Sequence, residues 1–239
     1  MIMSNFKKRS TENELMDTET ISFVEFKNCL RHLEIINIFS FAYRPTYAWL
    51  KKSLKGISHH KSIAIFDVGS GGGDMLRQIW KWTKKWGIQV SLTGIDANPW
   101  SKKSAEEFTS PDLPITFKTS DIFKFNPIQP PDFIISSLFT HHLTEHDLIT
   151  FIQWMDKYAI RGWFVNDLHR HCIPYFFIKY ATCLMPVNRI VRHDAPISVA
   201  RSFTIIDWYD LLKKAGIPKK EVYIKWFFPF RYGIARNKP

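Results

Sequence analysis

The chain has 239 residues, of which 45% are hydrophobic and 15% aromatic, so it is long enough to bury one sizeable core. It carries 33 Lys and Arg residues against 22 Asp and Glu residues, a formal net charge of +11 at pH 7. These charges are spread along the chain, so they permit contact with nucleic acid or peripheral contact with an anionic membrane surface without indicating either. The 3 cysteines are odd in number and not closely paired, so they indicate neither a disulfide framework nor a zinc site.

The sequence gives no sign of export or of a membrane span. The N-terminal residues lack the apolar core of a signal peptide, and the most apolar later stretch, 173–187, is broken by Pro174, Lys179 and Pro186. That stretch is shorter than a span of roughly 20 residues. We therefore expect a cytoplasmic protein without a transmembrane helix, in which the cysteines are small buried residues.

The first part of the chain is expected to be an N-terminal extension and helical cap over residues 1–55. Residues 1–18 are polar and charged, and predict a frayed end. Apolar side chains then recur at helical spacing over 22–39, and a second helix is expected over 46–54. These helices precede the first strand, so they should pack over the carboxyl edge of the sheet, with 55–61 as a linker into it.

The most informative stretch is 63–74, which reads IAIFDVGSGGGD. Its first half is typical of a strand buried on both faces of a parallel sheet, and helical spacing follows over 75–86. Gly69, Gly71 and Gly73 therefore join a strand to a helix, where a backbone without side chains can lie against a ligand. Asp74 stands where a dinucleotide fingerprint needs its last glycine, and the Lys and Ser or Thr of a phosphate loop are missing.

Two acids complete this pattern. Asp67 precedes the first glycine and suits a ligand with a cationic amine, and Asp96 ends the next strand, where a carboxylate can accept hydrogen bonds from both hydroxyls of a ribose. The arrangement resembles the class I S-adenosylmethionine (SAM) dependent methyltransferases from about residue 60 onwards. The resemblance implies SAM as cofactor, S-adenosylhomocysteine (SAH) as product, and cofactor contacts from Asp67, Gly69, Gly71, Gly73, Asp96, Ala97, Asp121, Ile122 and Ser137.

The remaining elements agree with that family's fold. We expect helices over 100–108, 145–158 and 203–215, strands over 115–118, 133–137 and 162–167, and two final antiparallel strands over 222–226 and 231–235. The fold class is α/β, with a doubly wound, seven-stranded, mostly parallel sheet and an antiparallel C-terminal strand. Residues 56–239 form the methyltransferase domain, and 169–201 form an insertion over the acceptor site after the fifth strand.

Three histidines are candidates for catalysis. A sulfonium methyl group is already activated, so the protein needs to align the acceptor and to remove a proton, a task that suits a histidine with a pKa near 6.5. His141 follows the fourth strand, His169 follows the fifth, and His193 lies in the insertion. We expect no metal.

Three short stretches refine the acceptor class. The residues NDLHRH over 166–171, VRHDAP over 191–196 and FTHHL over 139–143 resemble a group related to the quinone-biosynthesis methyltransferases. This resemblance implies a small hydrophobic acceptor, phenolic, polyketide-like or lipid-like, as in secondary metabolism, with methylation of an oxygen preferred to a carbon.

Two alternatives remain open. Net charge favours an RNA methyltransferase, but the fourth strand lacks the NPPY residues of nucleic-acid amino-methyltransferases and no RNA-binding module is appended, so nucleic acid is not the expected partner. The other alternative is a SAM-binding scaffold without catalysis, which an intact glycine loop does not exclude.

Overall fold

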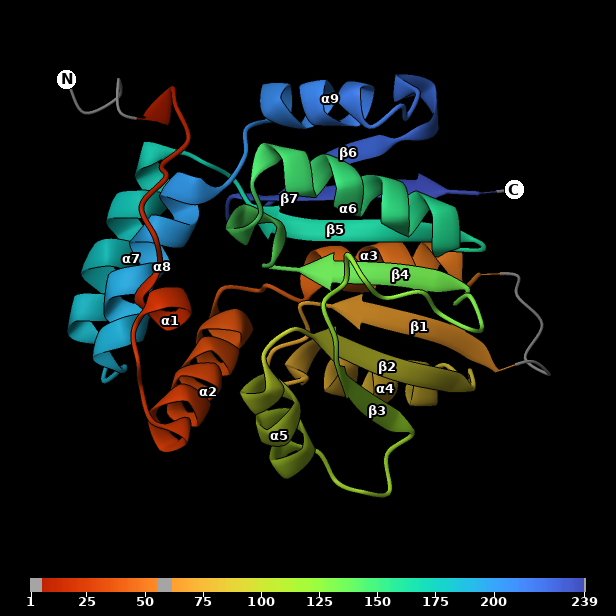
Figure 1. Ribbon diagram of the computed structural model, residues 1–239, viewed down its shortest axis with the longest axis horizontal. Helices are drawn as coiled ribbons and strands as arrows, with labels where there is room; N and C mark the ends of the chain where they lie inside the picture. The colour runs from red at the N-terminus through yellow and green to blue at the C-terminus, as the bar shows by residue number, and fades with distance from the viewer. Residues whose placement is uncertain (1–5, 56–61, 239) are drawn as a thin grey trace.

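The computed structural model describes residues 6–55 and 62–238, and its centre is a seven-stranded sheet in the order β3-β2-β1-β4-β5-β7-β6 (Figure 1). β7 is antiparallel to both of its neighbours, and the other neighbouring pairs are parallel. This confirms the predicted fold class. The strands are β1 (Ile63–Val68), β2 (Val90–Asp96), β3 (Ile115–Thr119), β4 (Phe133–Ser137), β5 (Gly162–Leu168), β6 (Tyr223–Phe227) and β7 (Arg231–Asn237).

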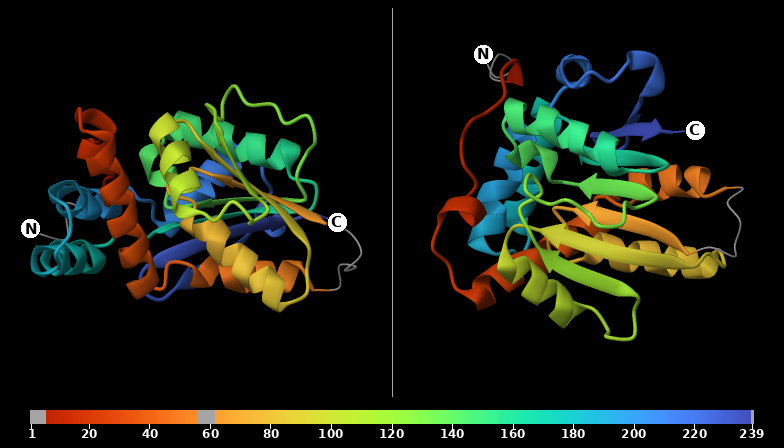
Figure 2. Two further views of the ribbon diagram at one scale, coloured as in Figure 1. Left: turned by 90° about the horizontal axis from the view of Figure 1, so that it is seen from below. Right: turned by 45° about the vertical axis from the view of Figure 1, so that its right-hand side comes forward.

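Helices cover both faces of the sheet and one of its ends. α3 (Arg44–Ser53), α4 (Asp74–Lys85) and α5 (Pro99–Phe108) pack on one face, and α6 (Glu145–Tyr158) and α9 (Ile205–Lys214) pack on the other (Figure 2). Beyond the carboxyl ends of the parallel strands lie α1 (Leu15–Thr18), α2 (Phe23–Phe39), α7 (Cys172–Leu184) and α8 (Arg189–Arg201). Two short 3-10 helices, η2 (Thr140–His142) and η3 (Lys219–Glu221), follow β4 and α9.

The core explains why the strands read as continuous apolar runs. Ile134 of β4 packs with the layer of α6 and α9, whereas Phe133 and Ile135 pack with the layer of α3 and α4. Successive strand residues point to opposite faces, so a strand covered on both faces needs apolar residues at every position. A third cluster, which includes Leu30 and Ile190, joins α2 to α8 at the end of the sheet.

Residues 6–18 are not frayed, contrary to expectation. The segment runs along α7 and α8 (Figure 1), where the backbone N–H of Ser10 donates to the carbonyl oxygen of Ala200. The guanidinium of Arg9 donates to the carbonyl oxygens of His141 and Arg201. Because these contacts come from distant parts of the chain, a local sequence pattern does not reveal them.

Other expectations for the N-terminal part and the insertion have mixed outcomes. α2 lies at the carboxyl edge as predicted, but α3 packs against β5 and β7 on a face of the sheet. The insertion consists of α7 and α8, which pack against each other. The predicted linker over 55–61 lies outside the described residues except for Lys55, and the division into 1–55 and 56–239 stays a prediction.

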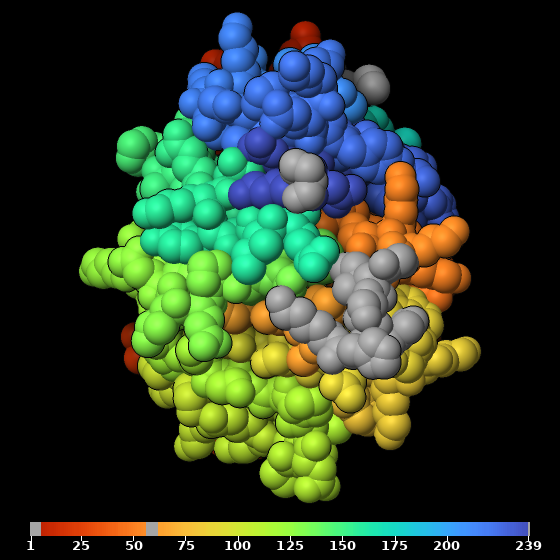
Figure 3. Space-filling model, turned by 90° about the vertical axis from the view of Figure 1, so that its right-hand side faces the viewer, coloured from red at the N-terminus to blue at the C-terminus, as the bar shows by residue number. Residues whose placement is uncertain are grey.

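Three smaller points concern the cysteines, the length of the helices and one face of the molecule. Cys29 is buried as expected, but Cys172 is half-buried and Cys183 is exposed, so burial does not hold for all of the cysteines. Among the described helices, none is long and apolar enough to cross a membrane. Figure 3 shows the end of the molecule opposite the N-terminal segment, where β7 (dark blue) reaches the surface close to residues of α3 (orange).

Candidate functional site

The glycine loop lies between β1 and α4 and has a backbone that only glycine adopts readily. Gly69, Gly71 and Gly73 have φ angles of 72°, 48° and 74°. A Cβ on Gly69 would lie 2.5 Å from the ring of Phe139, and one on Gly73 would lie 2.6 Å from the ring of Phe117. At Gly71 a Cβ would meet no described atom closer than 3.5 Å. Gly69 and Gly73 are therefore required by packing, whereas Gly71 leaves its backbone open to a neighbouring molecule.

A cavity of about 410 Å³ opens beside this loop, which is enough for a small molecule. Asp67, Ser70, Gly69, Gly71 and Gly72 form one wall, and residues at the carboxyl ends of β4 and β5 form another. The rest of the wall is mostly apolar and comes from α2, α7, α8 and the segment before β7. One cavity therefore joins the glycine loop to a chamber under the helices at the end of the sheet, which we call the apolar chamber.

Several buried polar groups in the cavity wall lack partners within the described chain. Asp67 is 2% exposed, its Oδ1 accepts no hydrogen bond, and burial raises its pKa well above the ordinary value. Arg231 donates through Nη2 to Ser40, but its Nε and Nη1 are unpaired, and burial lowers its pKa to about 10. The Oδ1 of Asn166 is also unpaired. Such groups cost free energy unless a ligand or water satisfies them, so they indicate a ligand with charged and polar groups.

A second polar cluster sits at the start of α4. Asp74 accepts hydrogen bonds from Tyr43 Oη at 2.7 Å and from Asn37 Nδ2 at 3.1 Å. Burial, followed by the nearby carboxylate of Asp74, raises the pKa of Tyr43. These bonds fix α2 and α3 against the glycine loop. Sequence reasoning recognised Asp74 only as a departure from the dinucleotide fingerprint and missed its partners, which lie in the N-terminal helices.

The third group is built on Asp167 at the end of β5. This buried carboxylate accepts from Nδ1 of His141 at 2.8 Å, from the backbone N–H of His141 at 3.0 Å and from the hydroxyl of Thr140. Burial alone would raise the pKa of Asp167, but the contact with His141 and these hydrogen bonds hold it at about 2. His141 lines the cavity, and its Nε2 lies 3.8 Å from Oε1 of Glu14. Neither Asp167 nor Glu14 was among the predicted site residues.

The structure brings some of the predicted cofactor residues together and not others. Asp67, Gly69, Gly71 and Ser137 line the cavity, and Gly73 is the N-cap of α4. Gly73 does not line the cavity, and neither do Asp96, Ala97, Asp121 and Ile122. Their roles in binding stay predictions.

Two of these residues already have backbone partners. Asp96 accepts from the backbone N–H groups of Gly71 and Asn98, both at 2.9 Å, so it braces the glycine loop. Burial raises the pKa of Asp96. Asp121 accepts from the backbone N–H of Phe123 at 3.0 Å, which is typical of an aspartate that caps a turn.

The other two predicted histidines lie away from the cavity wall. His169 has its Nε2 3.4 Å from the hydroxyl of Tyr232, while its Nδ1 finds no partner in the described ranges. The side chain of His193 is 41% exposed and contacts Asp194, which accepts hydrogen bonds from the backbone N–H groups at the start of α1. A catalytic role for His169 or His193 stays a prediction.

His169 should make the stability of the protein depend on pH. Burial holds its pKa at about 4, below the ordinary 6.5, so the unfolded chain takes up the proton first as the pH falls. We expect His169 to destabilise the folded protein progressively from about pH 6.5 towards pH 4, by less than about 1.4 kcal/mol per pH unit. His169→Gln should flatten the free energy of unfolding over this range in urea titrations, and the exposed His146→Gln should not. Parallel curves for the wild type and His169→Gln would contradict the burial of this histidine.

Comparison with known proteins finds solved structures that share this fold. No protein-family model matches the sequence, and no curated protein matches it. Human N-acetylserotonin methyltransferase in complex with SAM superposes with a TM-score of 0.65 at 16% identity, over 100% of this chain and 62% of that one. The plantazolicin methyltransferase BpumL in complex with SAH gives 0.58 at 18% identity, over 100% and 89% of the two chains.

A third solved structure, magnesium protoporphyrin IX methyltransferase from Synechocystis PCC 6803 with bound SAH, gives a TM-score of 0.58 at 14% identity, over 92% and 89% of the two chains. At these sequence identities the structural similarity establishes a shared fold and nothing further. The chain has the seven-stranded α/β fold of the class I SAM-dependent methyltransferases.

Proposed function

We propose that this protein is a SAM-dependent methyltransferase that acts on a small hydrophobic molecule and releases SAH. The observation that carries the proposal is the single cavity that joins the glycine loop, with its unpartnered buried Asp67, to the apolar chamber. The fold and the solved structures that share it support the same reaction class.

The residues of the loop fit this cofactor. Asp67 offers a negative charge to a cationic amine, and Gly71 offers a backbone that a ligand can approach closely. Asp96 ends the neighbouring strand, where it can accept hydrogen bonds from ribose hydroxyls in addition to the backbone bonds that it already accepts. SAM supplies a methyl group on a positively charged sulfur. We propose the remaining contacts from Gly69, Gly73, Ala97, Asp121, Ile122 and Ser137.

The protein must also orient the acceptor and remove its proton. The apolar chamber excludes water and holds a phenolic, polyketide-like or lipid-like molecule against the loop. We propose His141 for the proton, in preference to His169 and His193, because it lines the cavity and Asp167 fixes its ring. As the bond from methyl carbon to sulfur breaks and the bond to the acceptor oxygen forms, the proton of that oxygen passes to Nε2 of His141. We propose transfer to an oxygen in preference to a carbon.

The surface around the chamber supports a lipid-like acceptor. α7 turns apolar side chains to solvent, including Phe177 at 72% and Leu184 at 88% exposed, and both Ile173 and Phe177 also line the cavity. Peripheral contact with a membrane is therefore part of the proposal. Net charge alone favours RNA as the alternative acceptor.

Asp67→Asn separates cofactor binding from folding. The substitution keeps the shape of the side chain but removes the charge that we assign to the cofactor amine, so the Kd for SAM should rise at least tenfold, about 1.4 kcal/mol. Without cofactor the variant should be at least as stable as the wild type, because an unpaired buried carboxylate is removed. Calorimetric titration with SAM checks the first point and thermal unfolding the second, with the exposed Asp112→Asn as control. An unchanged Kd in a folded Asp67→Asn protein would refute the assignment.

The acceptor class can be decided with labelled SAM. Methyl incorporation should appear in phenols or a lipid extract and change little with salt, whereas transfer to RNA should collapse as salt rises because phosphate contacts dominate RNA binding. Once an acceptor is known, His141→Ala should lower turnover by about 10² to 10⁴ and leave the Kd for SAM unchanged. Salt-sensitive methylation of RNA, or wild-type turnover in His141→Ala, would overturn the corresponding part of the proposal.

A further inference from the structure

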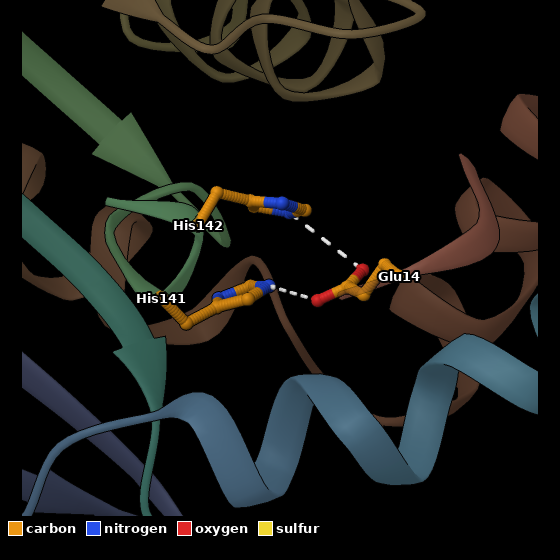
Figure 4. Close-up of side chains that lie close together, drawn as sticks. All are labelled: Glu14, His141 and His142. Atoms are coloured by element: carbon orange, nitrogen blue, oxygen red, sulfur yellow. Dashed lines mark ion pairs between the residues drawn. The ribbon is translucent and has the colours of Figure 1, made fainter. Parts of the chain in front are cut away.

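Glu14, His141 and His142 form a cluster whose geometry the proposed methyl transfer does not explain. Glu14 comes from the N-terminal segment just before α1, and the two histidines come from η2 after β4 (Figure 4). Both rings turn towards the carboxylate, so that His141 Nε2 lies 3.8 Å from Oε1 and His142 Nε2 lies 3.8 Å from Oε2. One ligand atom from each residue lies within 4.8 Å of the other two.

The second nitrogen of each ring is already held by a carboxylate. Nδ1 of His141 contacts Asp167 at 2.8 Å, and Nδ1 of His142 contacts Asp17 at 2.9 Å. A carboxylate accepts hydrogen bonds, so each Nδ1 carries a proton, and in the neutral form of each ring the lone pair of Nε2 faces Glu14. A carboxylate behind a histidine that points its other nitrogen at a cation is the usual support of a metal-binding histidine.

When both rings are neutral, two lone pairs face the carboxylate, and a cation between them would offset this repulsion. At 3.8 Å neither Nε2 is within hydrogen-bond range of the carboxylate oxygen that it faces. Glu14 is 5% exposed, and its Oε1 has no hydrogen-bond partner among the residues described. A metal with bonds of about 2.0 to 2.2 Å places neighbouring ligand atoms about 3 to 3.5 Å apart, so the three ligand atoms, which lie within 4.8 Å of one another, need to move closer together to share one ion.

The charges around the cluster also leave room for a cation. Glu14, Asp17 and Asp167 contribute three carboxylates, against the guanidiniums of Arg9 and Arg201. Arg201 is the group that competes with a metal, since its Nη1 lies 3.8 Å from Glu14 and 3.7 Å from Asp17. Its Nη2 is engaged with the carbonyl oxygen of His142 at 3.0 Å.

We propose that Glu14, His141 and His142 bind one divalent transition-metal cation. Two imidazole nitrogens and one carboxylate favour the zinc, iron(II) and manganese class over magnesium or calcium, which prefer oxygen ligands alone. All three residues line the cavity, so the remaining coordination positions open towards the apolar chamber. This site departs from the expectation of no metal.

The consequence for catalysis rests on the proposed function. A hydroxyl of the acceptor that coordinates the cation loses its proton more readily, and the proton passes to water. The methyl group then forms its bond to that oxygen as its bond to sulfur breaks. In the metal-loaded protein His141 is therefore a ligand, and it removes the proton directly only in the metal-free protein. The cation also ties the N-terminal segment to η2 and so closes the chamber on that side.

The test uses the metal alone, without SAM or acceptor. Full-length protein is stripped with a chelator and titrated with Zn²⁺ by calorimetry and with Co²⁺ by visible absorption, which reports the coordination of the ion. We expect one equivalent to bind with a Kd on the order of micromolar or lower. Mg²⁺ at the same concentration should not compete.

Variants locate the site and control for folding. His142→Ala and Glu14→Gln should each weaken Co²⁺ binding at least tenfold and change its spectrum, and the exposed His146→Ala on α6 should do neither. Asp17→Asn removes the carboxylate behind His142, which also faces Arg201, in a residue whose side chain is 44% exposed, and should raise the Kd about tenfold without loss of fold.

Absence of stoichiometric binding, or binding that is equal in the wild type, His142→Ala and Asp17→Asn, would overturn the metal proposal. Neither outcome bears on the effect of Asp67→Asn on SAM. An unchanged SAM affinity in Asp67→Asn, conversely, would leave the metal site standing.

Discussion

The candidate site depends on the buried carboxylate of Asp167. β4 and β5 are parallel neighbours, so both end at the same edge of the sheet, and Asp167 at the end of β5 reaches the turn that follows β4. There it accepts hydrogen bonds from Thr140 and from both the backbone and the ring of His141. An ionised carboxylate in this place fixes the position of η2 and the tautomer of His141 together, and turns Nε2 of that ring towards the cavity.

The same edge explains why the glycine loop and the apolar chamber meet. The carboxyl ends of parallel strands are where an open α/β sheet leaves a crevice, and β1, β4 and β5 all contribute to the cavity wall. α2, α7 and α8 then roof the crevice with apolar side chains, while Asp67 and Arg231 remain in the wall as buried charges without enough partners in the described chain. This combination favours a cofactor with a charged end and an acceptor that carries no charge.

The sheet and the loop could be predicted from sequence because both depend on local physics. Burial on two faces forces continuous apolar strands, and a backbone with positive φ at Gly69 and Gly71 forces glycine. The histidines could not be ranked in this way. His141 and His169 both follow strands, and only the path of the chain after β5, where the N–H of His169 bonds to the carbonyl of Phe230, takes His169 away from the cavity.

The order of the N-terminal segment could not be predicted from the sequence for a similar reason. Its residues have no periodic pattern, and its order comes from partners far along the chain, such as Arg9 with His141 and the start of α1 with Asp194. Yet Glu14 and Met16 from this segment line the cavity. The site is thus completed by a part of the chain that local propensity assigns to no element.

The measurement that tests the central claim most directly is a crystal structure of the protein with SAH, which carries the same amine and ribose as SAM. We expect SAH at the glycine loop, with its amine at Asp67, its chain against Gly71 and its sulfur facing the apolar chamber. Protein that is saturated with SAH in solution but holds it elsewhere, or that leaves this cavity empty, would contradict the account.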